Sequence, residues 1–267
     1  MEPAVLRDFI ARHRRIFVLT GAGCSTESGI PDYRDTDGSW KRSPPVSFQA
    51  FMGSVAVRRR YWARSFVGWP HLRRAEPNGA HAALARLEQR GRLELLLTQN
   101  VDGLHQAAGS SEVIDLHGRL DRVLCTDCHG LSSRDDMQAE LLRLNPAWAR
   151  LQGRAAPDGD ADLEGLPFSG FAVPSCARCD GVLKPDVVFF GERVPPDRVE
   201  EAMRRLDRAD AVLVVGSSLM VYSGYRFVQS AVQAGKPVAA VNLGRTRADE
   251  LLTLKVRQPC ALALAAL

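Results

Sequence analysis

Short apolar runs that stop at glycine or at polar residues recur along the chain. Four of them lie at Ile16–Thr20, Leu93–Thr98, Ala211–Val215 and Pro237–Val241. Their length and continuous apolar character are typical of strands that are buried on both faces of a parallel sheet. The runs therefore predict a set of buried parallel strands.

Segments with helical spacing of apolar residues lie between these runs. They are found at Val5–His13, His81–Arg90, Asp197–Arg208 and Tyr225–Ala234. Strands that alternate with helices build open sheets with helices on both faces. The pattern thus predicts an α/β fold with a doubly wound parallel sheet, that is, a Rossmann-like domain.

Two regions interrupt this alternation. Residues 35–77 are polar and rich in aromatic side chains, and residues 121–184 carry paired cysteines. We interpret them as a helical insert and a zinc-binding insert that together form a smaller domain. Residues 1–34, 78–120 and 185–267 then form the Rossmann-like domain. From Arg154 to Gly170 the chain is rich in glycine, proline, alanine and aspartate, which predicts an exposed loop.

The composition is that of a globular protein that can bury a core. Of 267 residues, 45% are hydrophobic and 25% are charged. The formal net charge of +4 rests mainly on arginine and is not gathered in a tail, so we expect no direct nucleic-acid binding. The sequence has no apolar stretch of membrane-spanning length and no secretory signal at its start, which predicts a cytoplasmic protein without a membrane partner.

Four of the six cysteines fall in two C-x-x-C pairs. Cys125 and Cys128 form the first pair, and Cys176 and Cys179 form the second. Each pair places two thiolates on one tight turn, and four thiolates complete a tetrahedral shell around Zn²⁺ that leaves no position for water. We therefore predict one structural zinc ion. A redox role is less consistent with the pattern, because neither pair opens a helix after a strand.

A glycine turn follows directly on the first predicted strand. It comprises Gly21, Ala22, Gly23, Cys24, Ser25 and Thr26. Such a turn can bring backbone N–H groups to the pyrophosphate of a dinucleotide. However, Thr26 stands where G-x-G-x-x-G has its third glycine, and many βα turns need glycine for the turn alone. This motif by itself leaves both interpretations open.

Small or amide residues follow three other predicted strands. They are Gln99, Asn100, Val101 and Asp102; Gly216, Ser217 and Ser218; and Asn242, Leu243 and Gly244. Each group alone is consistent with a simple turn. The carboxyl ends of parallel strands meet at one edge of a sheet, where ligands bind. Together with the glycine turn, these residues predict a single ligand crevice.

His117 lies just before the cysteine-bearing insert, near the expected cleft between the two domains. An imidazole that titrates near neutrality suits proton abstraction from a sugar hydroxyl. A single histidine is more often a packed or surface residue, so its position alone does not assign a catalytic role.

Several motifs resemble those of the sirtuin family, and they occur in the same order. They are Gly21–Ser25, Gly29–Arg34, Gln99–Asp102, His117–Gly118, both cysteine pairs, Pro185–Glu192 and Gly216–Leu219. The resemblance covers nearly the whole chain. Segments Tyr61–Arg64, Phe66–Trp69 and Val221–Arg226 are similar to the class II branch, which includes a mitochondrial member.

The resemblance implies an NAD-dependent protein lysine deacylase, in which NAD is a consumed co-substrate. The carbonyl oxygen of an acyl-lysine attacks C1′ of the NAD ribose, and the products are nicotinamide, free lysine and O-acyl-ADP-ribose. It implies that His117 helps to deprotonate the ribose hydroxyls and that Asn100 orients the ribose and a water. Val101 and Asp102 would bind the nicotinamide carboxamide.

The resemblance also implies two sets of binding residues. The NAD set is Gly21, Ala22, Gly23, Ser25, Thr26, Asp32, Tyr33, Arg34, Gln99, Asn100, Val101, Asp102, Gly216, Ser217, Ser218, Asn242, Leu243, Gly244 and Cys260. Cys260 is equally well explained as a buried thiol. The partner would be an acylated-lysine peptide, bound as an added strand between a strand at Val188–Glu192 and the segment Leu219–Tyr222. Its contacts would be Val188, Phe189, Gly191, Glu192, Leu219 and Val221, and we expect a monomer.

The acyl group is the least determined feature. Tyr61 and Arg64 are spaced Y-x-x-R on an expected helix, and such a pair can present a hydroxyl and a guanidinium to an acidic acyl tail such as succinyl or glutaryl. Class III sirtuins use a pair of this kind. A solvated helix face or a contact between domains explains the same spacing, and long aliphatic or lipoyl chains remain open.

Two other functions compete with deacylation. A mono-ADP-ribosyltransferase would use the same NAD crevice and release nicotinamide without freeing an acyl group. A zinc-ribbon module that only binds acyl-lysine or nucleic acid would need no chemistry. The presence of His117, Asn100 and Asp102 together argues against the binding module.

Overall fold

The computed structural model describes residues 2–41, 45–163, 165–265 and 267. Residues 42–44 and 164 of the two predicted inserts, and residues 1 and 266 of the predicted Rossmann-like domain, lie outside the described residues.

A parallel sheet forms the larger part of the molecule. Within the described residues it has six strands in the order β11-β10-β9-β1-β2-β3, and its strands pair in parallel throughout. This order reverses direction between β1 and β9, as in a doubly wound dinucleotide-binding sheet. The predicted fold class is confirmed. The strands are β1 (Ile16–Thr20), β2 (Leu93–Thr98), β3 (Val113–Asp115), β9 (Ala211–Val215), β10 (Val238–Val241) and β11 (Leu254–Val256).

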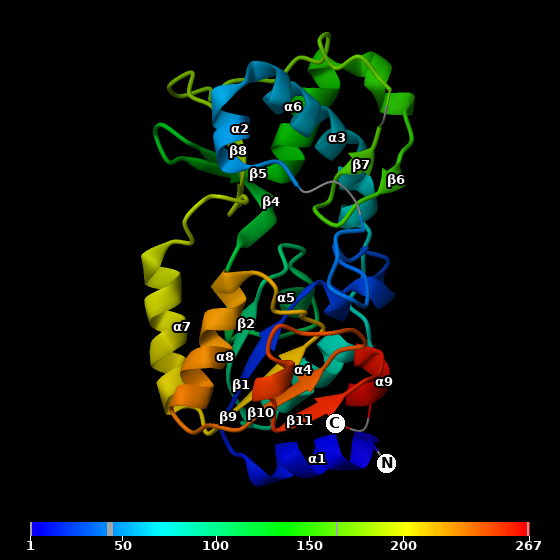
Figure 1. The fold of residues 1–267 in the computed structure, drawn as a ribbon. Coiled ribbons are helices and arrows are strands. Elements are labelled where there is room, and N and C mark those ends of the chain that lie inside the picture. The colour runs from blue at the N-terminus through cyan, green and yellow to red at the C-terminus, as the bar shows by residue number, and fades with distance from the viewer. Residues whose placement is uncertain (1, 42–44, 164, 266) are drawn as a thin grey trace.

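Successive side chains of the strands pack on opposite faces of the sheet. In β1, Ile16 and Val18 join a core with α1 and α4, whereas Phe17 and Leu19 join a core with α7 and α8. Helices thus cover both faces, as Figure 1 shows. Their bounds are α1 (Glu2–Arg12), α4 (Gly79–Gln89), α5 (Leu104–Ala107), α7 (Pro196–Arg208), α8 (Tyr222–Gln233) and α9 (Cys260–Leu264).

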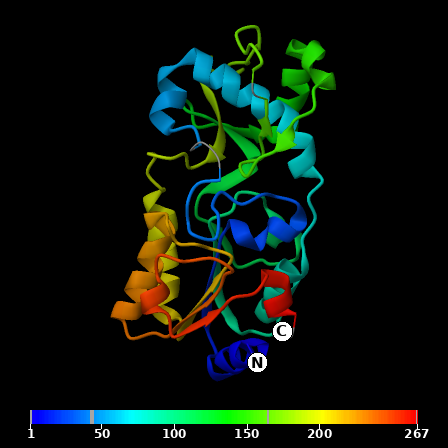
Figure 2. The same cartoon turned by 45° about the vertical axis from the view of Figure 1, so that its right-hand side comes forward.

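A smaller part stands above the carboxyl edge of this sheet in both views (Figures 1 and 2). It has an antiparallel sheet in the order β5-β4-β8 and a hairpin of β6 and β7. Its elements are α2 (Phe48–Gly53), α3 (Val55–Arg73), β4 (Gly118–Cys125), β5 (Leu131–Ser133), α6 (Arg134–Leu144), β6 (Arg154–Ala155), β7 (Ala161–Asp162) and β8 (Leu183–Val187). Four 3-10 helices complete the description: η1 (Ala22–Cys24), η2 (Thr26–Ser28), η3 (Pro146–Arg150) and η4 (Asp249–Leu251).

Two strands link the smaller part to the larger one. The predicted domain boundaries at residues 120/121 and 184/185 fall inside β4 and β8. The two strands pair antiparallel from Gly118 with Val187 at one end to Cys125 with Leu183 at the other. The domain division itself stays a prediction.

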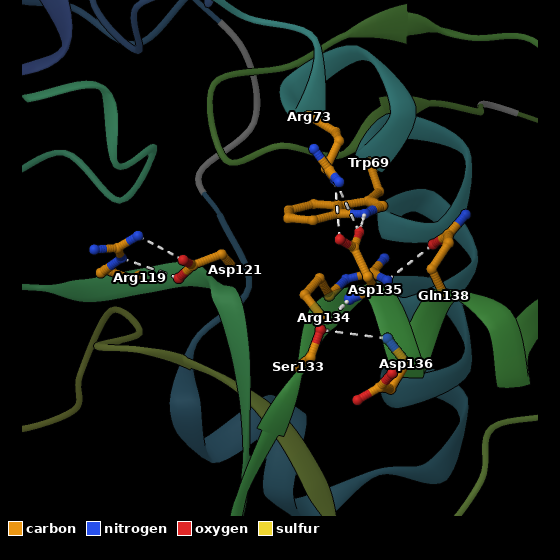
Figure 3. A network of polar contacts seen from close by, with 9 residues as sticks. All are labelled: Trp69, Arg73, Arg119, Asp121, Ser133, Arg134, Asp135, Asp136 and Gln138. Carbon is orange, nitrogen blue, oxygen red and sulfur yellow. Dashed lines mark hydrogen bonds and ion pairs between the residues drawn. The ribbon is translucent and has the colours of Figure 1, made fainter. Parts of the chain in front are cut away.

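A buried arginine ties α3 to α6. Arg134 is 1% exposed, and its guanidinium lies over the rings of Trp62 and Trp69, at 5.4 and 4.9 Å from the ring centres. It donates to the carbonyl and hydroxyl oxygens of Ser65 and to Gln138 Oε1. Figure 3 shows this site, where the indole of Trp69 also donates to Asp135. Because the charge is bonded and stacked, its burial is tolerated.

The expected exposed loop from Arg154 to Gly170 is wrong in its first half. There β6 and β7 form a hairpin, and Ala156, Asp160, Ala161 and Leu163 are buried. The hairpin packs on α3 so closely that a Cβ on Gly68 would lie 2.3 Å from the Asp160 carbonyl carbon. Small residues suit this contact, which is why the composition was misleading.

No helix in the described part of the chain is both long and apolar enough to cross a membrane.

Replacing Arg134 with alanine should destabilise the smaller part. The change removes packing against two tryptophans and leaves the buried Ser65 and the half-buried Gln138 without their donor. We expect a loss of about 3 kcal/mol in the free energy of unfolding, measured by urea denaturation with tryptophan fluorescence. Arg143 is the matched control, since it lies on the same helix and pairs with Glu140 at the surface. Equal stability of the Arg134→Ala and Arg143→Ala variants would show that Arg134 does not hold α3 and α6 together.

Candidate active site

A cavity of about 1100 Å³ lies at the carboxyl edge of the parallel sheet and is also lined by residues of the smaller part, such as Tyr61 and Pro157. Its lining contains His117 and every residue of the predicted NAD set. It also contains all of the predicted peptide contacts and, of the two predicted acyl contacts, Tyr61 but not Arg64. The structure therefore brings together side chains from sequence positions as distant as Gly21 and Cys260.

The glycine turn is shaped by contact with a second turn. Gly21 N donates to Val215 O at 3.1 Å, and Gly23 N donates to Gly216 O at 2.8 Å. A Cβ on Gly21 would lie 2.8 Å from Ser217 Cβ, and one on Gly23 would lie 2.9 Å from Gly216 O. These glycines are required by the meeting of the β1 and β9 turns. The chain then continues in the short η1 and η2 instead of one long helix.

A buried hydrogen-bond network lies behind this turn. The hydroxyl of Ser25 donates to Asp102 Oδ2 at 2.7 Å and accepts from Asn100 Nδ2 at 3.0 Å. Asn100 Nδ2 also donates to Gly21 O. His81 Nε2 lies 3.5 Å from Ser25 Oγ, a contact that sequence reasoning missed. The network fixes the amide of Asn100 and the carboxylate of Asp102 at the cavity wall.

His117 is held by both of its ring nitrogens. Nδ1 lies 3.0 Å from the backbone carbonyl of Gln99, which only accepts, so Nδ1 carries the proton. Nε2 then accepts from the hydroxyl of Ser223 at 2.8 Å. Burial lowers the pKa of His117 to about 4, with smaller contributions from Arg198 and Arg226. The imidazole is neutral near pH 7, with its basic nitrogen directed at Ser223.

Ser223 is a site residue that sequence reasoning did not single out. It lies in the first turn of α8 and is 9% exposed. The sequence did contain one signal for it. Ser223 lies in the helix that follows β9, and β9 ends at the edge of the sheet where ligands bind. Its hydroxyl is hydrogen-bonded to Nε2 of His117, which is the nitrogen that would accept a proton from a substrate.

The segment predicted to cover the nicotinamide folds over the cavity. Arg34 donates to Gly38 O at 2.7 Å and lies 3.9 Å over the ring of Trp40. Trp40 contacts Tyr33 and Phe190 edge to face. Asp32 pairs with Lys41 at 2.5 Å. The ring of Trp40 thus connects this segment to the predicted peptide segment.

The other end of the cavity is formed by the turn after β10 and by α9. Asn242 Nδ2 donates to Gly244 O, while Leu243 is 58% exposed. Gly244 lies so close to Thr36 that a Cβ would be 2.6 Å from the Thr36 carbonyl oxygen. Cys260 lines the cavity yet is only 6% exposed, and burial raises its pKa to about 12. It is therefore a thiol, which fits both interpretations made from sequence.

The strand predicted at Val188–Glu192 is wrong in position. The strand β8 ends at Val187, and Gly191 turns the chain at a φ of 79°. Val188 N already donates to His117 O at 2.8 Å. Glu192 accepts from Lys184 and from Phe189 N, so its carboxylate stabilises the turn from within. The apolar run had suggested a longer strand than this turn allows.

Tyr61 and Arg64 lie on α3 as predicted, but the structure separates their side chains. Tyr61 is 6% exposed and lines the cavity. Arg64 Nε pairs with Asp160 Oδ2 at 2.8 Å and donates to Ala161 O at 3.0 Å. The guanidinium serves the contact between α3 and the hairpin, which contradicts its predicted role as a reader of acidic acyl tails.

The four paired cysteines form one cluster at the tip of β4. Their sulfurs lie within 4.8 Å of one another, with Cys125 and Cys179 at 3.5 Å and Cys128 and Cys176 at 3.8 Å. Zn–S bonds of about 2.3 Å in a tetrahedron place sulfurs about 3.8 Å apart, so the four thiolates fit Zn²⁺. After each pair, His129 and Asp180 adopt a left-handed backbone, with φ of 56° and 59°. Both turns are thus shaped to present two sulfurs each.

Zinc should be retained by the purified protein at one ion per chain and released by Cys176→Ser. Loss of one thiolate opens the shell, and metal binding contributes to the folding of such modules. The measurement is metal content by inductively coupled plasma mass spectrometry, with Cys260→Ala as the control because Cys260 belongs to neither group of possible metal ligands among the described residues. Full zinc content in Cys176→Ser would show that the cluster is not the site.

Ser223→Ala should raise the pKa of His117 above about 4. The serine hydroxyl donates to the neutral imidazole, so its loss removes an interaction that favours the unprotonated form. We expect the acid limb of kcat/KM for NAD to move to higher pH by about one unit, and histidine NMR of the NAD-free protein to show the same direction. Ser230→Ala, on the same helix, is the control. An unchanged titration in Ser223→Ala would remove Ser223 from the site.

Comparison with known proteins agrees with this site. A model of the Sir2 family matches residues 21–223. An NAD-dependent protein deacetylase of Xanthomonas campestris pv. campestris (strain 8004) is 66% identical over 260 residues, which cover 97% of this chain and 89% of that protein. The mitochondrial NAD-dependent protein lipoamidase sirtuin-4 of Bos taurus is 49% identical over 258 residues, covering 96% and 82%.

Among solved structures, one described as a Sir2 complex with a p53 peptide and NAD⁺ superposes with a TM-score of 0.78. It is 30% identical, and the match covers 100% of this chain and 97% of that one. The family model spans the glycine turn, His117 and both cysteine pairs. The chain belongs to the Sir2 family, the sirtuins.

Proposed function

We propose that this protein is an NAD-dependent protein lysine deacylase with His117 as its general base. One observation carries the proposal: a neutral, buried imidazole with a single accepting nitrogen lies in the same cavity as Asn100 and Asp102. The names of the relatives, which include NAD-dependent protein deacetylases, support the same reaction class.

NAD would supply the electrophilic ribose carbon and the nicotinamide leaving group, so the chain itself must supply orientation and proton transfer. His117 Nε2 takes a ribose proton once the substrate hydroxyl replaces that of Ser223. The Gln99 carbonyl accepts from Nδ1–H and stabilises the imidazolium that forms. This bond also keeps the ring in the tautomer that can act as a base.

Asn100 and Asp102 would position the ribose and the nicotinamide carboxamide. Both Asn100 donors are engaged by Gly21 O and Ser25 Oγ, so its side-chain oxygen is the group left for a substrate hydroxyl or water. Asp102 accepts from Ser25 and from Leu104 N, which fixes its carboxylate. Such fixed groups lower the cost of orienting the reactants.

We further infer that the chain belongs to the class II branch of sirtuins. Its 49% identity with bovine sirtuin-4, a mitochondrial protein named as a lipoamidase, supports this assignment and adds lipoyl-lysine to the acyl groups worth testing. Bacterial deacetylases at 66% identity keep acetyl-lysine on the same list. The monomeric state, the cytoplasmic location and the absence of nucleic-acid binding stay predictions.

His117→Ala should reduce deacylation by about 10²–10⁴-fold, because the proton acceptor is lost. The assay is mass spectrometry of purified protein with NAD and lysine peptides that carry acetyl, longer aliphatic, lipoyl, succinyl or glutaryl groups. His13→Ala is the matched control, since His13 lies at the end of α1 away from the cavity.

Each other outcome selects a different function. Nicotinamide release with mass added to protein, and no free lysine, would establish an ADP-ribosyltransferase. No nicotinamide release with any peptide would leave only a binding module. Equal rates in wild type and His117→Ala would refute His117 as the base.

A further inference from the structure

The hairpin of β6 and β7 forms one end of the cavity, and what it presents there bears on the acyl group of the proposed deacylase. Its turn brings Pro157 and Asp158 into the cavity lining, where Tyr33 and Tyr61 also lie. Gly159, at a φ of 69°, completes the turn, and Ala156 N donates to Asp160 O to close it. The turn is thus a built part of the wall.

The positive charge nearest to this end is already engaged. Arg64 pairs with Asp160 Oδ2 at 2.8 Å and does not line the cavity. Arg134, which also acts electrostatically on Tyr61, is 1% exposed and is held between two tryptophans. Neither guanidinium is available to an acyl tail that reaches Tyr61.

Asp160 is the buried acidic residue next to this turn. Its Oδ2 faces Arg64, while its Oδ1 is buried and has no hydrogen-bond donor among the described residues. Its carboxyl neighbour is Asp158, and burial followed by this neighbour raises the pKa of Asp160 to about 8. The pair of Arg64 and Asp160 is thus internal to the contact between α3 and the hairpin, and Asp158 is the carboxyl group of this turn that lines the cavity.

The charge of Asp158 reaches the side chains that would surround an acyl chain. After burial, Asp158 is the largest cause of the raised pKa of both Tyr33 and Tyr61. The cationic side chains that do line the cavity are Arg34, Lys41, Arg193 and Arg226. Of these, Arg34 donates to Gly38 O and Lys41 pairs with Asp32.

We propose that Asp158 makes this end of the cavity reject acyl chains that end in a carboxylate, so that the enzyme acts on lysines with uncharged acyl groups. This inference rests on the proposed deacylase function. A succinyl or glutaryl tail that reaches Tyr61 would bring a second carboxylate toward Asp158, and neither Arg64 nor Arg134 is free to pair with it. Like charges in a partly buried site repel strongly. An uncharged chain of the same length meets the tyrosine rings and Pro157 without that cost.

The test compares peptides that differ only at the end of the acyl chain. Butyryl-lysine and succinyl-lysine have the same chain length, as do pentanoyl-lysine and glutaryl-lysine. We expect the wild-type kcat/KM to favour the uncharged member of each pair by about 10²-fold, and Asp158→Asn to reduce this ratio by about tenfold. Asp136→Asn is the control, because it removes an exposed aspartate of α6 that does not line the cavity.

Equal kcat/KM for the two members in wild type, or an unchanged ratio in Asp158→Asn, would overturn the proposal. Binding of the same peptides, measured by isothermal titration calorimetry without turnover, carries the same expected ratio. If no peptide is deacylated, the proposed function fails, and the binding ratio still decides whether Asp158 excludes carboxylates. Tighter binding of the succinyl-lysine peptide than of the butyryl-lysine peptide would also refute the proposed role of Asp158.

Discussion

The close contact between the turns after β1 and β9 is the constraint on which the site depends. Two backbone hydrogen bonds join these turns, and no Cβ fits at Gly21 or Gly23. The strand order reverses between β1 and β9, which opens the crevice there. Because the turns meet so closely, Ser25 and Ser217 face the ends of β2, where Ser25 bonds Asn100 and Ser217 bonds Gln99. The Gln99 backbone in turn holds the imidazole of His117.

The sequence was most informative where one local rule decided the structure. Continuous apolar runs located β1, β2 and β9 to the residue, because strands buried on both faces leave a signal that needs no knowledge of neighbours. The cysteine spacing likewise located the four-sulfur cluster. By contrast, β3 and β11 are only three residues each and mix polar with apolar side chains. Their own sequence pattern does not identify them as strands, because they form only by pairing with the neighbouring strand.

The features that sequence reasoning missed are decided by contacts across the fold. Arg64 had the right spacing for an acyl reader, but a hairpin nearly a hundred residues away provides Asp160 as its partner. That hairpin has the composition of an exposed loop, and only the room left by Gly68 turns it into a buried wall. Ser223 contacts His117 because the first turn of α8 lies beside the segment that follows β3. A contact between residues 106 positions apart cannot be predicted from a local sequence pattern.

The pairing of β4 with β8 connects the candidate active site to the cysteine cluster. β4 is 8 residues long, so its first residue, next to His117, lies at most about 23 Å from Cys125 in the cysteine cluster. β8 returns along it and continues into Val188, whose N–H donates to the carbonyl of His117. The cysteine cluster thus lies at the far end of the strand pair that begins beside His117. A substitution beside the cluster, for example at Arg178, whose guanidinium donates to Cys128 Sγ, would therefore reach His117 through the backbone without altering a side chain of the cavity.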